Sequence, residues 1–391
     1  MDIIRLLGVI IVEYPRYLLS STYDSSRFWN NCIRINVLYT KVLQAIAINY
    51  ISSDFYYHLN NIPYELSELP VIEHLTCTKI IGSGMISIVL EGVDEKGKNY
   101  IVKTKRIGID NKIMNGLQQI NNIAKWLQYI PFISTFPIKF IVNQFENMML
   151  EQLSFSNEIK YHKKFKENNK YNTNIVIPDI IDEYCSPTQI VMTKIEGTHY
   201  TNSLIAELRD EYIKYIVEMS CKNLILDGFI HSDLHAGNII FTPDYKIGII
   251  DFGLMIQLTV KERQSFFDLL RYLSTHDYDK AVSIVISELI EPVHIKKTLT
   301  IEQLDTLKKS LIQLYTQIYS IHKSFTVKDI LAIIHLLHQY NLTISIVFYK
   351  LMFFIVSCQC FIHKLTPIYL HLFMDKIKDI FVELNENEED E

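Results

Sequence analysis

Three polar residues in one short segment constrain this chain more than any other feature: Asp233, Asn238 and Asp251. Asn238 follows Asp233 by five positions, and Asp251 follows Asn238 by thirteen. Apolar runs at 239–241 and 249–250 lie between the last two and are typical of short buried strands. Carboxylate and amide oxygens are the ligands that a hard cation prefers. The segment therefore predicts a strand-and-loop island that holds a Mg²⁺ site beside a further carboxylate.

A second segment, far upstream, has glycines in a pattern suited to phosphate binding. Residues 82–89 fit G-x-G-x-x-[GS]-x-V. Glycine lets the backbone approach phosphate oxygens because it has no Cβ. The expected nucleotide-binding residues here are Gly82, Ser83, Gly84, Met85, Ile86, Ser87 and Val89, of which Val89 would cover the adenine ring. Taken alone, the pattern is equally consistent with an ordinary hairpin turn.

A lysine follows the glycine pattern at the distance that a strand, a hairpin and a second strand require. This residue is Lys103, and in kinases the lysine of this strand pairs with the α- and β-phosphates and with a helix glutamate. Two helix glutamates, Glu158 and Glu151, are candidates for that partner, and the family resemblance described below favours Glu158. The end of the expected strand at 189–192 and the chain just after it form the expected hinge to adenine. The candidate hinge residues are Met192, Thr193 and Ile195.

The order of these segments predicts the fold class. We expect an α+β, two-lobed protein-kinase-like fold with a β-rich N-lobe, a helical C-lobe and a helical N-terminal extension. The predicted parts are a helical extension at 1–75, an N-lobe at 76–197, a C-lobe at 198–380 with the catalytic loops, and a disordered acidic tail at 381–391. Within the N-lobe, strands are expected at 175–177 and 189–192, and one helix at 144–170.

The island also resembles a known family. It reads His-x-Asp-x-His-x-Gly-Asn from His231 and ends in an intact Asp251-Phe252-Gly253. The first of these forms resembles aminoglycoside phosphotransferases, choline kinases and the ABC1/UbiB (ADCK) family of atypical kinases, and the intact Asp-Phe-Gly favours ABC1/UbiB. Residues 102–109 are similar to that family's VKVQRPGI run, 177–180 and 185–192 to its VP…ME block, and 41–44 to its KxGQ motif. The resemblance covers residues from about 30 to about 370.

Three departures from the family pattern stand out. The glycine of KxGQ is Leu43, the Ala-rich nucleotide loop is Gly82-Ser83-Gly84, and the ExD motif is Gln152-Leu153-Ser154. The family is thought to use these features to restrain typical kinase chemistry. Their loss is consistent with a more kinase-like enzyme or with a decayed member.

The resemblance implies an atypical kinase or ATPase that uses ATP and Mg²⁺. Asp233 would be the catalytic base or positioning group, and Asn238 and Asp251 would bind the metal. Two alternatives stay open: a nucleotide-binding scaffold without catalysis, and a small-molecule phosphotransferase of the aminoglycoside or choline kinase type. The spacing of His231, Asp233 and His235 also resembles a metal cluster of another kind.

The acceptor is expected not to be a peptide. Soon after Gly253 the chain reaches residues 258–263, which open a helix with Thr259 as its N-cap. No activation segment and no A-P-E motif follow, and those parts normally dock a peptide substrate. A small-molecule or lipid acceptor, linked to quinone metabolism near a membrane, is what the family resemblance implies.

Charge, cysteines and hydropathy bound partners and location. The net charge of −6 gives no reason to expect a nucleic acid partner. The six scattered cysteines indicate reduced, mostly buried thiols and an intracellular compartment. The N-terminus lacks a small-residue cleavage site, so no signal peptide is expected.

One apolar segment bears on the membrane. Residues 342–363 are apolar but include Lys350 near the middle, so a buried C-lobe helix is favoured over a membrane span. We expect a cytoplasmic protein, or one peripheral to a membrane through its C-terminal lobe. The sequence does not predict an oligomeric state.

Overall fold

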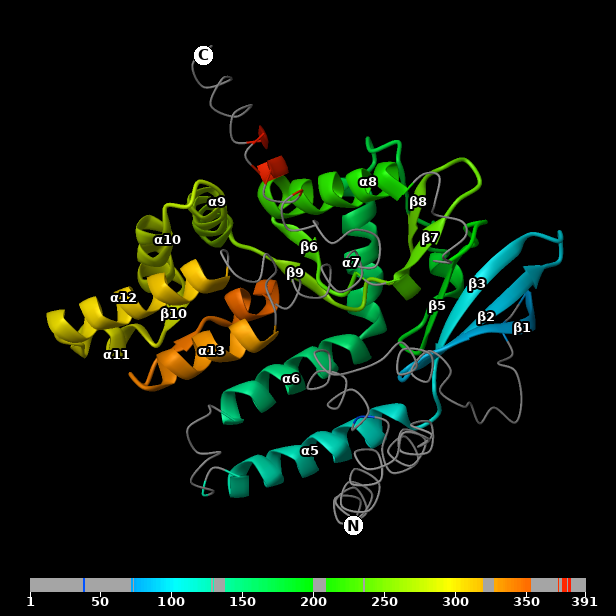
Figure 1. Cartoon of the computed structure of the whole chain (residues 1–391). Helices are drawn as coiled ribbons and strands as arrows, with labels where there is room; N and C mark the ends of the chain where they lie inside the picture. The colour runs from blue at the N-terminus through cyan, green and yellow to red at the C-terminus, as the bar shows by residue number, and fades with distance from the viewer. Residues whose placement is uncertain are drawn as a thin grey trace, which may run out of the picture. The chain divides into compact units, whose positions relative to one another are not determined.

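The chain forms two compact units in the computed structural model, whose elements are shown in Figure 1. The first unit comprises Met1–Ile133, Ile138–Lys160 and Pro178–Lys194, and the second Ser134–Pro137, Tyr161–Ile177 and Ile195–Glu391. The structure describes residues 38, 72, 74–127, 129, 138–199, 209–234, 236–318, 327–352, 372, 375–377 and 379–380. The KxGQ-like residues 41–44 and the acidic tail therefore lie outside the described residues. The domain limits drawn from the sequence stay predictions.

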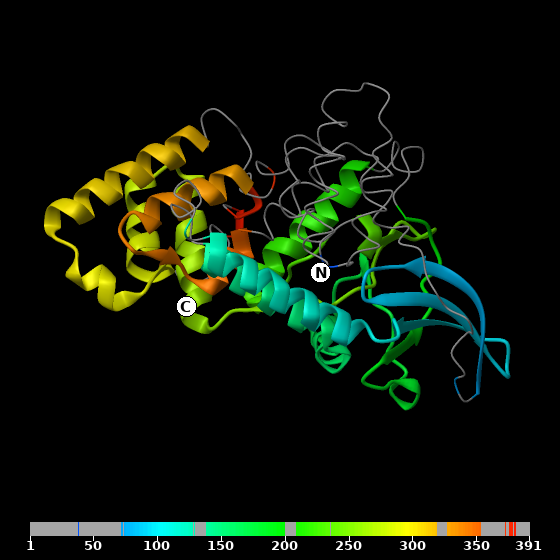
Figure 2. The ribbon, with the colours of Figure 1, turned by 90° about the horizontal axis from the view of Figure 1, so that it is seen from below.

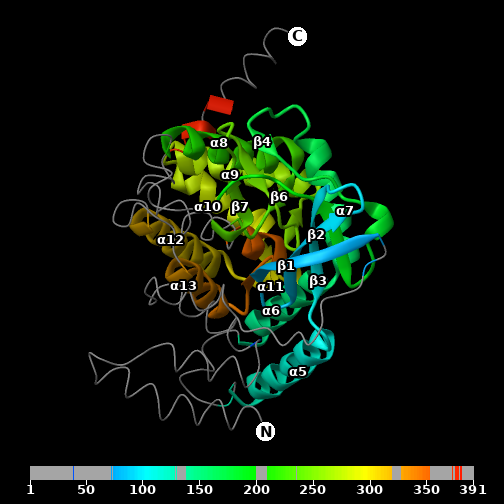
Figure 3. The same ribbon diagram turned by 90° about the vertical axis from the view of Figure 1, so that its right-hand side faces the viewer.

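An antiparallel sheet forms the β part of the first unit. Its strands are β1 (Leu75–Ser83), β2 (Ser87–Asp94), β3 (Asn99–Lys105) and β5 (Gln189–Thr193), in the order β1-β2-β3-β5. Figure 1 labels all four strands, and Figure 3 labels β1, β2 and β3 in a second view. A tight turn joins β2 to β3: Asp94 Oδ1 accepts the backbone N–H groups of Lys96 and Lys98, both at 2.9 Å. A short 3₁₀ turn, Asp182–Tyr184, precedes β5.

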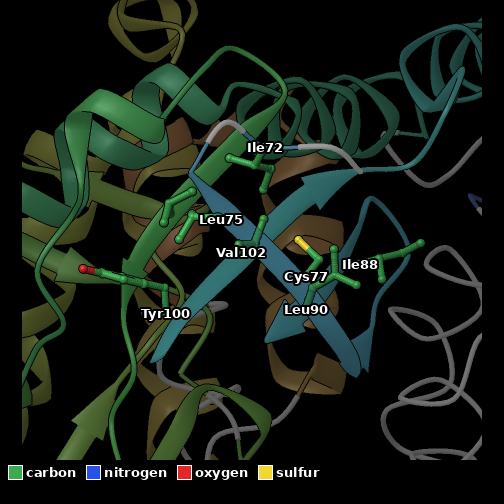
Figure 4. Packing of buried hydrophobic residues seen from close by; sticks show 8 residues of the cluster. Ile72, Leu75, Cys77, Ile88, Leu90, Tyr100 and Val102 are labelled. Carbon is green, nitrogen blue, oxygen red and sulfur yellow. The ribbon is translucent and has the colours of Figure 1, made fainter. Parts of the chain in front are cut away.

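One face of this sheet carries a hydrophobic core (Figure 4). Strand side chains alternate between faces, so every second residue of a strand reaches the same layer. Leu90 and Val102, opposite each other on β2 and β3, are fully buried. The buried members of this cluster are Ile72, Leu75, Cys77, Ile88, Leu90, Tyr100, Val102 and Val191.

Three helices follow β3 in the chain: α5 (Ile109–Leu127), α6 (Ile138–Leu153) and α7 (Phe155–Asn168). The sequence prediction of one helix at 144–170 is therefore wrong in number and in bounds. Helices α5 and α6 lie side by side in the first unit, as Figure 1 also shows. The sequence pattern that could have predicted α5 is its apolar residues spaced four apart. Three of them, Ile109, Ile113 and Leu117, are buried on one face of the helix. Asparagines and a glycine within α5 weakened that signal because they disfavour helix.

Ser154 divides α6 from α7. Its N–H bonds to the Glu151 carbonyl at 3.1 Å, which closes α6. Its hydroxyl then accepts the N–H of Asn157 at 3.3 Å and so caps the start of α7. Serine favours caps over helix interiors because its side chain competes for nearby backbone groups.

In the second unit, a short strand precedes a helix in the chain and further short strands follow it, among the residues that the structure describes. Helix α8 (Arg209–Lys222) continues as a π-turn, Asn223–Asp227, and ends at Gly228 in the left-handed conformation. The strands are β4 (Ile175–Val176), β6 (Phe229–His231), β7 (Ile239–Phe241), β8 (Ile247–Ile249) and β9 (Met255–Gln257), with a 3₁₀ turn at Ala236–Asn238. They pair as β4-β8-β7 and as β6-β9. The predicted strand and loop island is confirmed in this form.

Helices make up most of the remainder of the second unit. They are α9 (Val260–Ser274), α10 (Tyr278–Ile284) with a π-turn at Val285–Leu289, α11 (Val293–Thr298), α12 (Ile301–Gln317) and α13 (Val327–His338), and β10 (Ile290–Glu291) pairs with β11 (Thr343–Ile344). Helices α12 and α13 lie side by side (Figure 2). The predicted N-cap at Thr259 is confirmed: its hydroxyl accepts the N–H of Glu262, and the Glu262 side chain returns a bond to Thr259.

The apolar segment at 342–363 begins with β11 and continues as helix at 346–352. Its remainder lies outside the described residues. Within the part of the chain that the structure describes, no helix is both long enough and apolar enough to cross a bilayer.

Two cysteines of the described residues are buried, as the sequence led us to expect. Cys77 lies in the sheet core and Cys221 in α8. Desolvation by burial raises the thiol pKa of both, so both stay protonated at neutral pH.

A glycine fixes the chain between β5 and α8 against β7. Gly197 has φ of +155°, and a Cβ there would lie 2.4 Å from the Phe241 carbonyl oxygen. The close approach allows Thr198 and Phe241 to exchange two backbone hydrogen bonds, of 3.0 and 2.8 Å. We expect Gly197→Ala to lower the free energy of unfolding by at least about 1–3 kcal/mol, measured by chemical denaturation.

Gly97→Ala is the matched control for this prediction. Gly97 also has positive φ, +79°, but a Cβ there would meet nothing within 4 Å. This variant has backbone strain without the clash, so it should destabilise less. Equal losses in the two variants would show that contact with Phe241 is not what requires glycine at 197.

Candidate active site

The glycine pattern forms the tip of the β1–β2 hairpin. Ser83 pairs with Ile88, and the Gly84 N–H bonds to the Ser87 carbonyl at 2.9 Å. Met85 and Ile86 therefore form the turn itself. The Met85 side chain is 9% exposed and packs in a cluster with Leu38, Ile109, Ile113, Leu117, Met149 and Leu153. The hairpin is thus anchored to α5 and α6 through its own tip.

Lys103 and Glu158 form a buried ion pair. Lys103 Nζ donates to Glu158 Oε1 at 2.6 Å, and the two side chains are 11% and 4% exposed. The Phe155 ring lies 5.6 Å from the same Nζ. Because β2 and β3 are antiparallel in register, Val89 lies directly opposite Lys103. The lysine expected to bind phosphate and the valine expected to cover adenine are therefore cross-strand neighbours in the sheet.

The start of α7 decides which glutamate meets Lys103. Glu158 lies in the first turn of the helix that Ser154 caps, and its N–H bonds to the Ser154 carbonyl at 3.0 Å. Glu151, the alternative from the sequence, lies on α6 and is half-buried. The structure therefore places Glu158 as the partner of Lys103.

The expected hinge residues follow the alternation of β5. Met192 is 4% exposed and packs against Phe155 and Ile190 in the core. Thr193 is tied to Asp179: its N–H bonds to the Asp179 carbonyl at 2.9 Å, and its hydroxyl accepts the Asp179 N–H at 2.9 Å. A hydrogen bond donated by the hinge backbone to an adenine ring would therefore come from an N–H group after Thr193.

The chain beyond Thr193 is held in place within each unit. In the first unit Lys194 bonds to Glu91 at 2.8 Å, which lowers the pKa of that carboxyl. In the second unit Ile195 packs over Gly248, where a Cβ would lie 3.1 Å from Ile195 Cδ1. A residue with a side chain at 248 would displace Ile195.

The β7–β8 hairpin brings Asn238 and Asp251 together. Ile239 pairs with Ile249, and the Ile250 N–H bonds to the Asn238 carbonyl at 3.2 Å. Asn238 immediately precedes β7, and Asp251 comes two residues after β8 ends. Because the strands are antiparallel, these two positions meet at the open end of the hairpin.

His231 joins the Asp233 loop to the Asp251 backbone. His231 pairs with Met255 across β6 and β9, and its Nε2 donates to the Asp251 carbonyl. Its Nδ1 accepts the Asp233 N–H at 3.3 Å. One neutral tautomer, protonated at Nε2, satisfies both bonds. His231 thus positions both acidic residues of the island through backbone groups.

The side chains of Asn238 and Asp251 are turned in a way that suits a hard cation. Asn238 Nδ2 donates to the Asp233 carbonyl at 2.9 Å. The backbone contact thus uses the amide nitrogen, which cannot bind a cation, and not the amide oxygen. Asp251 Oδ1 accepts the Gly253 N–H at 2.9 Å, which fixes the carboxylate. Amide and carboxylate oxygens are the donors that Mg²⁺ prefers, so the types of residue present fit the metal.

Phe252 is fully buried in an aromatic cluster. The sequence did not lead us to expect this cluster. The ring of His162 lies 4.4 Å from that of Phe252, Phe165 5.2 Å and His231 5.6 Å, centroid to centroid. His162 and Phe165 follow Glu158 by four and seven positions on α7. That spacing puts them on one helix face, so it was the signal that could have found them.

His235, the third residue of the metal-cluster alternative, lies outside the described residues. Among the residues that the structure does describe, no three His, Cys, Asp or Glu side chains gather as a metal cluster. The roles assigned from sequence to Lys103, Asp233, Asn238 and Asp251 stay predictions.

Comparison with known families decides the relationship. The family model for the ABC1 atypical kinase-like domain matches residues 77–285, just over half of the chain. The chain belongs to the ABC1 family. The resemblance seen in the sequence and the expected kinase-like α+β fold are thereby confirmed. The match runs from β1 to the π-turn after α10, and so includes both the Lys103–Glu158 pair and the island.

Several curated relatives carry the names of ABC1-type kinases. The protein ACTIVITY OF BC1 COMPLEX KINASE 3, chloroplastic, of Arabidopsis thaliana is 27% identical over 188 residues, which cover 47% of this chain and 26% of that protein. The probable protein kinase UbiB of Cronobacter sakazakii is 22% identical over 217 residues, covering 53% of this chain and 40% of that protein. The chain thus spans about a quarter to two fifths of these two relatives.

One solved structure aligns with most of the chain. A complex of Rv3197 with erythromycin from Mycobacterium tuberculosis is 13% identical, with a TM-score of 0.45, and the alignment covers 93% of this chain and 91% of that one.

Proposed function

We propose that this ABC1-family chain is an ATP- and Mg²⁺-dependent atypical kinase or ATPase. The observation that carries the proposal is the buried ion pair between Lys103 and Glu158, at 2.6 Å. In protein kinases the corresponding pair must form before phosphoryl transfer can occur. A pair of buried charges is also costly to desolvate, so it favours a functional role over a purely structural one.

Each charged residue has a distinct role in this proposal. Lys103 binds the α- and β-phosphates of ATP while Glu158 holds its ammonium group in position. Asn238 Oδ1 and the Asp251 carboxylate would hold Mg²⁺. When bound, the metal neutralises charge that develops on the phosphate oxygens.

Asp233 would orient the acceptor. Its loop is fixed because Asn238 bonds to its carbonyl and His231 accepts its N–H. In transfer, the acceptor hydroxyl gives its proton to Asp233, its oxygen bonds to the γ-phosphorus, and the bond to ADP breaks. With water as the acceptor, the same geometry gives an ATPase. Such chemistry depends mainly on positioning and charge neutralisation.

The acceptor is proposed to be a small molecule or a lipid. Between Gly253 and the start of α9 at Val260, the chain forms only β9 and a short link. This leaves no room for the activation segment on which kinases normally bind a peptide. The UbiB relative is named a probable protein kinase, but that name describes the relative and does not identify the acceptor of this chain.

A second candidate function is a nucleotide-binding scaffold without turnover. The observation that favours it is the Gly84 N–H, which bonds to Ser87 within the hairpin. That amide is then used by the protein itself, whereas kinase glycine loops cover the phosphates with their backbone. The two candidates differ in one measurable property, which is turnover.

The test of the proposed function is transfer of the γ-phosphoryl group from ATP in the presence of Mg²⁺. Purified protein is incubated separately with a peptide mixture and with a mixture of small alcohols and hydroxyl-bearing lipids. We expect ADP formation with both mixtures. A product that carries the labelled γ-phosphoryl group of ATP is expected only with the alcohols and lipids. Labelling of peptides alone would refute the proposed acceptor class.

A further inference from the structure

Arg106 contacts the glycine hairpin at three points. It follows β3 directly, three positions beyond Lys103. Its backbone N–H bonds to the Ile86 carbonyl at 2.9 Å. Its guanidinium donates through Nε to the Gly84 carbonyl at 2.9 Å and through Nη2 to Ser83 Oγ at 2.6 Å. The contacts therefore cover both sides of the turn formed by residues 84–87.

The backbone around Arg106 is itself fixed. The Ile109 N–H bonds to the Arg106 carbonyl at 3.2 Å, in a turn where Gly108 has φ of +67°. Lys105 pairs with Asp110 at 2.9 Å across the same turn. Arg106 is thus held at the junction of β3 and α5 and reaches the hairpin from a rigid base.

A glycine hairpin needs such a support. Glycine loses more conformational freedom on ordering than any other residue, so an unsupported Gly-Ser-Gly turn samples many conformations. The guanidinium is a planar fork whose donors are pre-organised, so one side chain restrains two acceptors at once. Lysine, with a single flexible ammonium, cannot replace that geometry.

We propose that Arg106 is a positioning residue that holds the hairpin of residues 82–87 in the conformation that binds nucleotide phosphates. The proposal rests on the proposed function. It assigns Arg106 no contact with the reacting atoms, because it acts through Ser83 and Gly84. Its effect should therefore depend on the phosphates of the ligand and should be small for adenosine.

The experiment compares Arg106→Gln, Arg106→Lys, Ser83→Ala and the double variant of Ser83→Ala with Arg106→Gln. Dissociation constants of ATP and adenosine are measured by calorimetry. We expect Arg106→Gln to weaken ATP about 10-fold and adenosine less than about 2-fold, with Arg106→Lys in between. The double variant should bind ATP about as weakly as Arg106→Gln alone, since the two residues form one contact.

Lys79→Gln serves as the matched control. Lys79 is exposed on β1, so its loss removes one positive charge from the same sheet without touching the hairpin turn. We expect ATP affinity within about 2-fold of the parent, as for an exposed charge. Equal loss of affinity for ATP and adenosine in Arg106→Gln, or strictly additive losses in the double variant, would overturn the proposal.

A second readout separates this proposal from the proposed function. Amide hydrogen exchange of residues 82–88 is followed in the protein without nucleotide. We expect exchange in Arg106→Gln to be at least about 5-fold faster than in the parent. Faster exchange in Arg106→Gln, combined with no ATP binding by the parent, would refute the proposed function and still establish that Arg106 restrains the hairpin. Unchanged exchange would refute the role of Arg106.

Discussion

Asp251→Asn is expected to reduce Mg²⁺-dependent ATP turnover by at least about 100-fold. The substitution removes the charge that would hold the metal, and metal ions contribute several kcal/mol of transition-state stabilisation in such reactions. It keeps Oδ1, which accepts the Gly253 N–H at 2.9 Å, so the turn after β8 stays intact. The measurement is steady-state ADP formation by the parent and the variant at saturating ATP.

Asp244→Asn is the matched control for Asp251. Asp244 lies in the turn between β7 and β8, where it accepts from Thr242 Oγ1 at 2.6 Å and pairs with Lys246 at 2.8 Å. It belongs to the same hairpin but lies at its closed end. We expect Asp244→Asn to keep turnover within about 2-fold of the parent, as for an exposed pair. Parental turnover by Asp251→Asn would show that Asp251 binds no catalytic metal.

Glu158→Ala is expected to cause the second large effect, on stability and on nucleotide affinity. It leaves the Lys103 ammonium, 11% exposed, without its carboxylate. Removing one partner of a buried ion pair typically costs about 3–5 kcal/mol because the other charge remains buried and unpaired. Chemical denaturation measures that loss, and calorimetry measures the accompanying loss of ATP affinity. Glu158→Gln keeps an acceptor oxygen, so it should lose less stability.

The control for Glu158 is the other glutamate that the sequence offered. Glu151→Ala removes a half-buried carboxylate of α6, and the Glu151 carbonyl still closes that helix with Ser154. We expect a loss of stability below that of Glu158→Ala and unchanged ATP affinity. Equal effects of the two alanine variants would contradict the assignment of Glu158 as the residue that positions Lys103.

Fold class and family followed from sequence because the decisive residues are close together in the chain. Asn238 and Asp251 flank the short β7–β8 hairpin and Asp233 lies in the loop just before it, so their spacing follows directly from strand and turn lengths. The capping box of Thr259 and Glu262 is equally local. Local rules of this kind leave little freedom for the surrounding structure.

Contacts between distant segments could not be predicted in the same way. The choice of Glu158 over Glu151 depends on where Ser154 breaks the helix, and serine is also common on helix surfaces. The clamp of Arg106 on Ser83 joins residues 23 positions apart. The helical spacing of His162 and Phe165 places them on one face of α7, but only the tertiary structure shows that Phe252 packs against that face.

Ser154, the last residue of the ExD-like segment, has a structural role in this chain. Its hydroxyl accepts the N–H of Asn157 at 3.3 Å and so caps α7. Serine is a good N-cap, so this residue helps to begin the helix that carries Glu158.

The most direct test of the account is Mg²⁺-dependent turnover by the unmodified protein, with nucleotide binding measured on the same sample. We predict equimolar ATP binding and steady ADP formation in Mg²⁺, with no ADP formed when EDTA replaces the metal. ATP bound without any turnover, even after lipid vesicles are added, would contradict the enzyme and identify a nucleotide-binding scaffold.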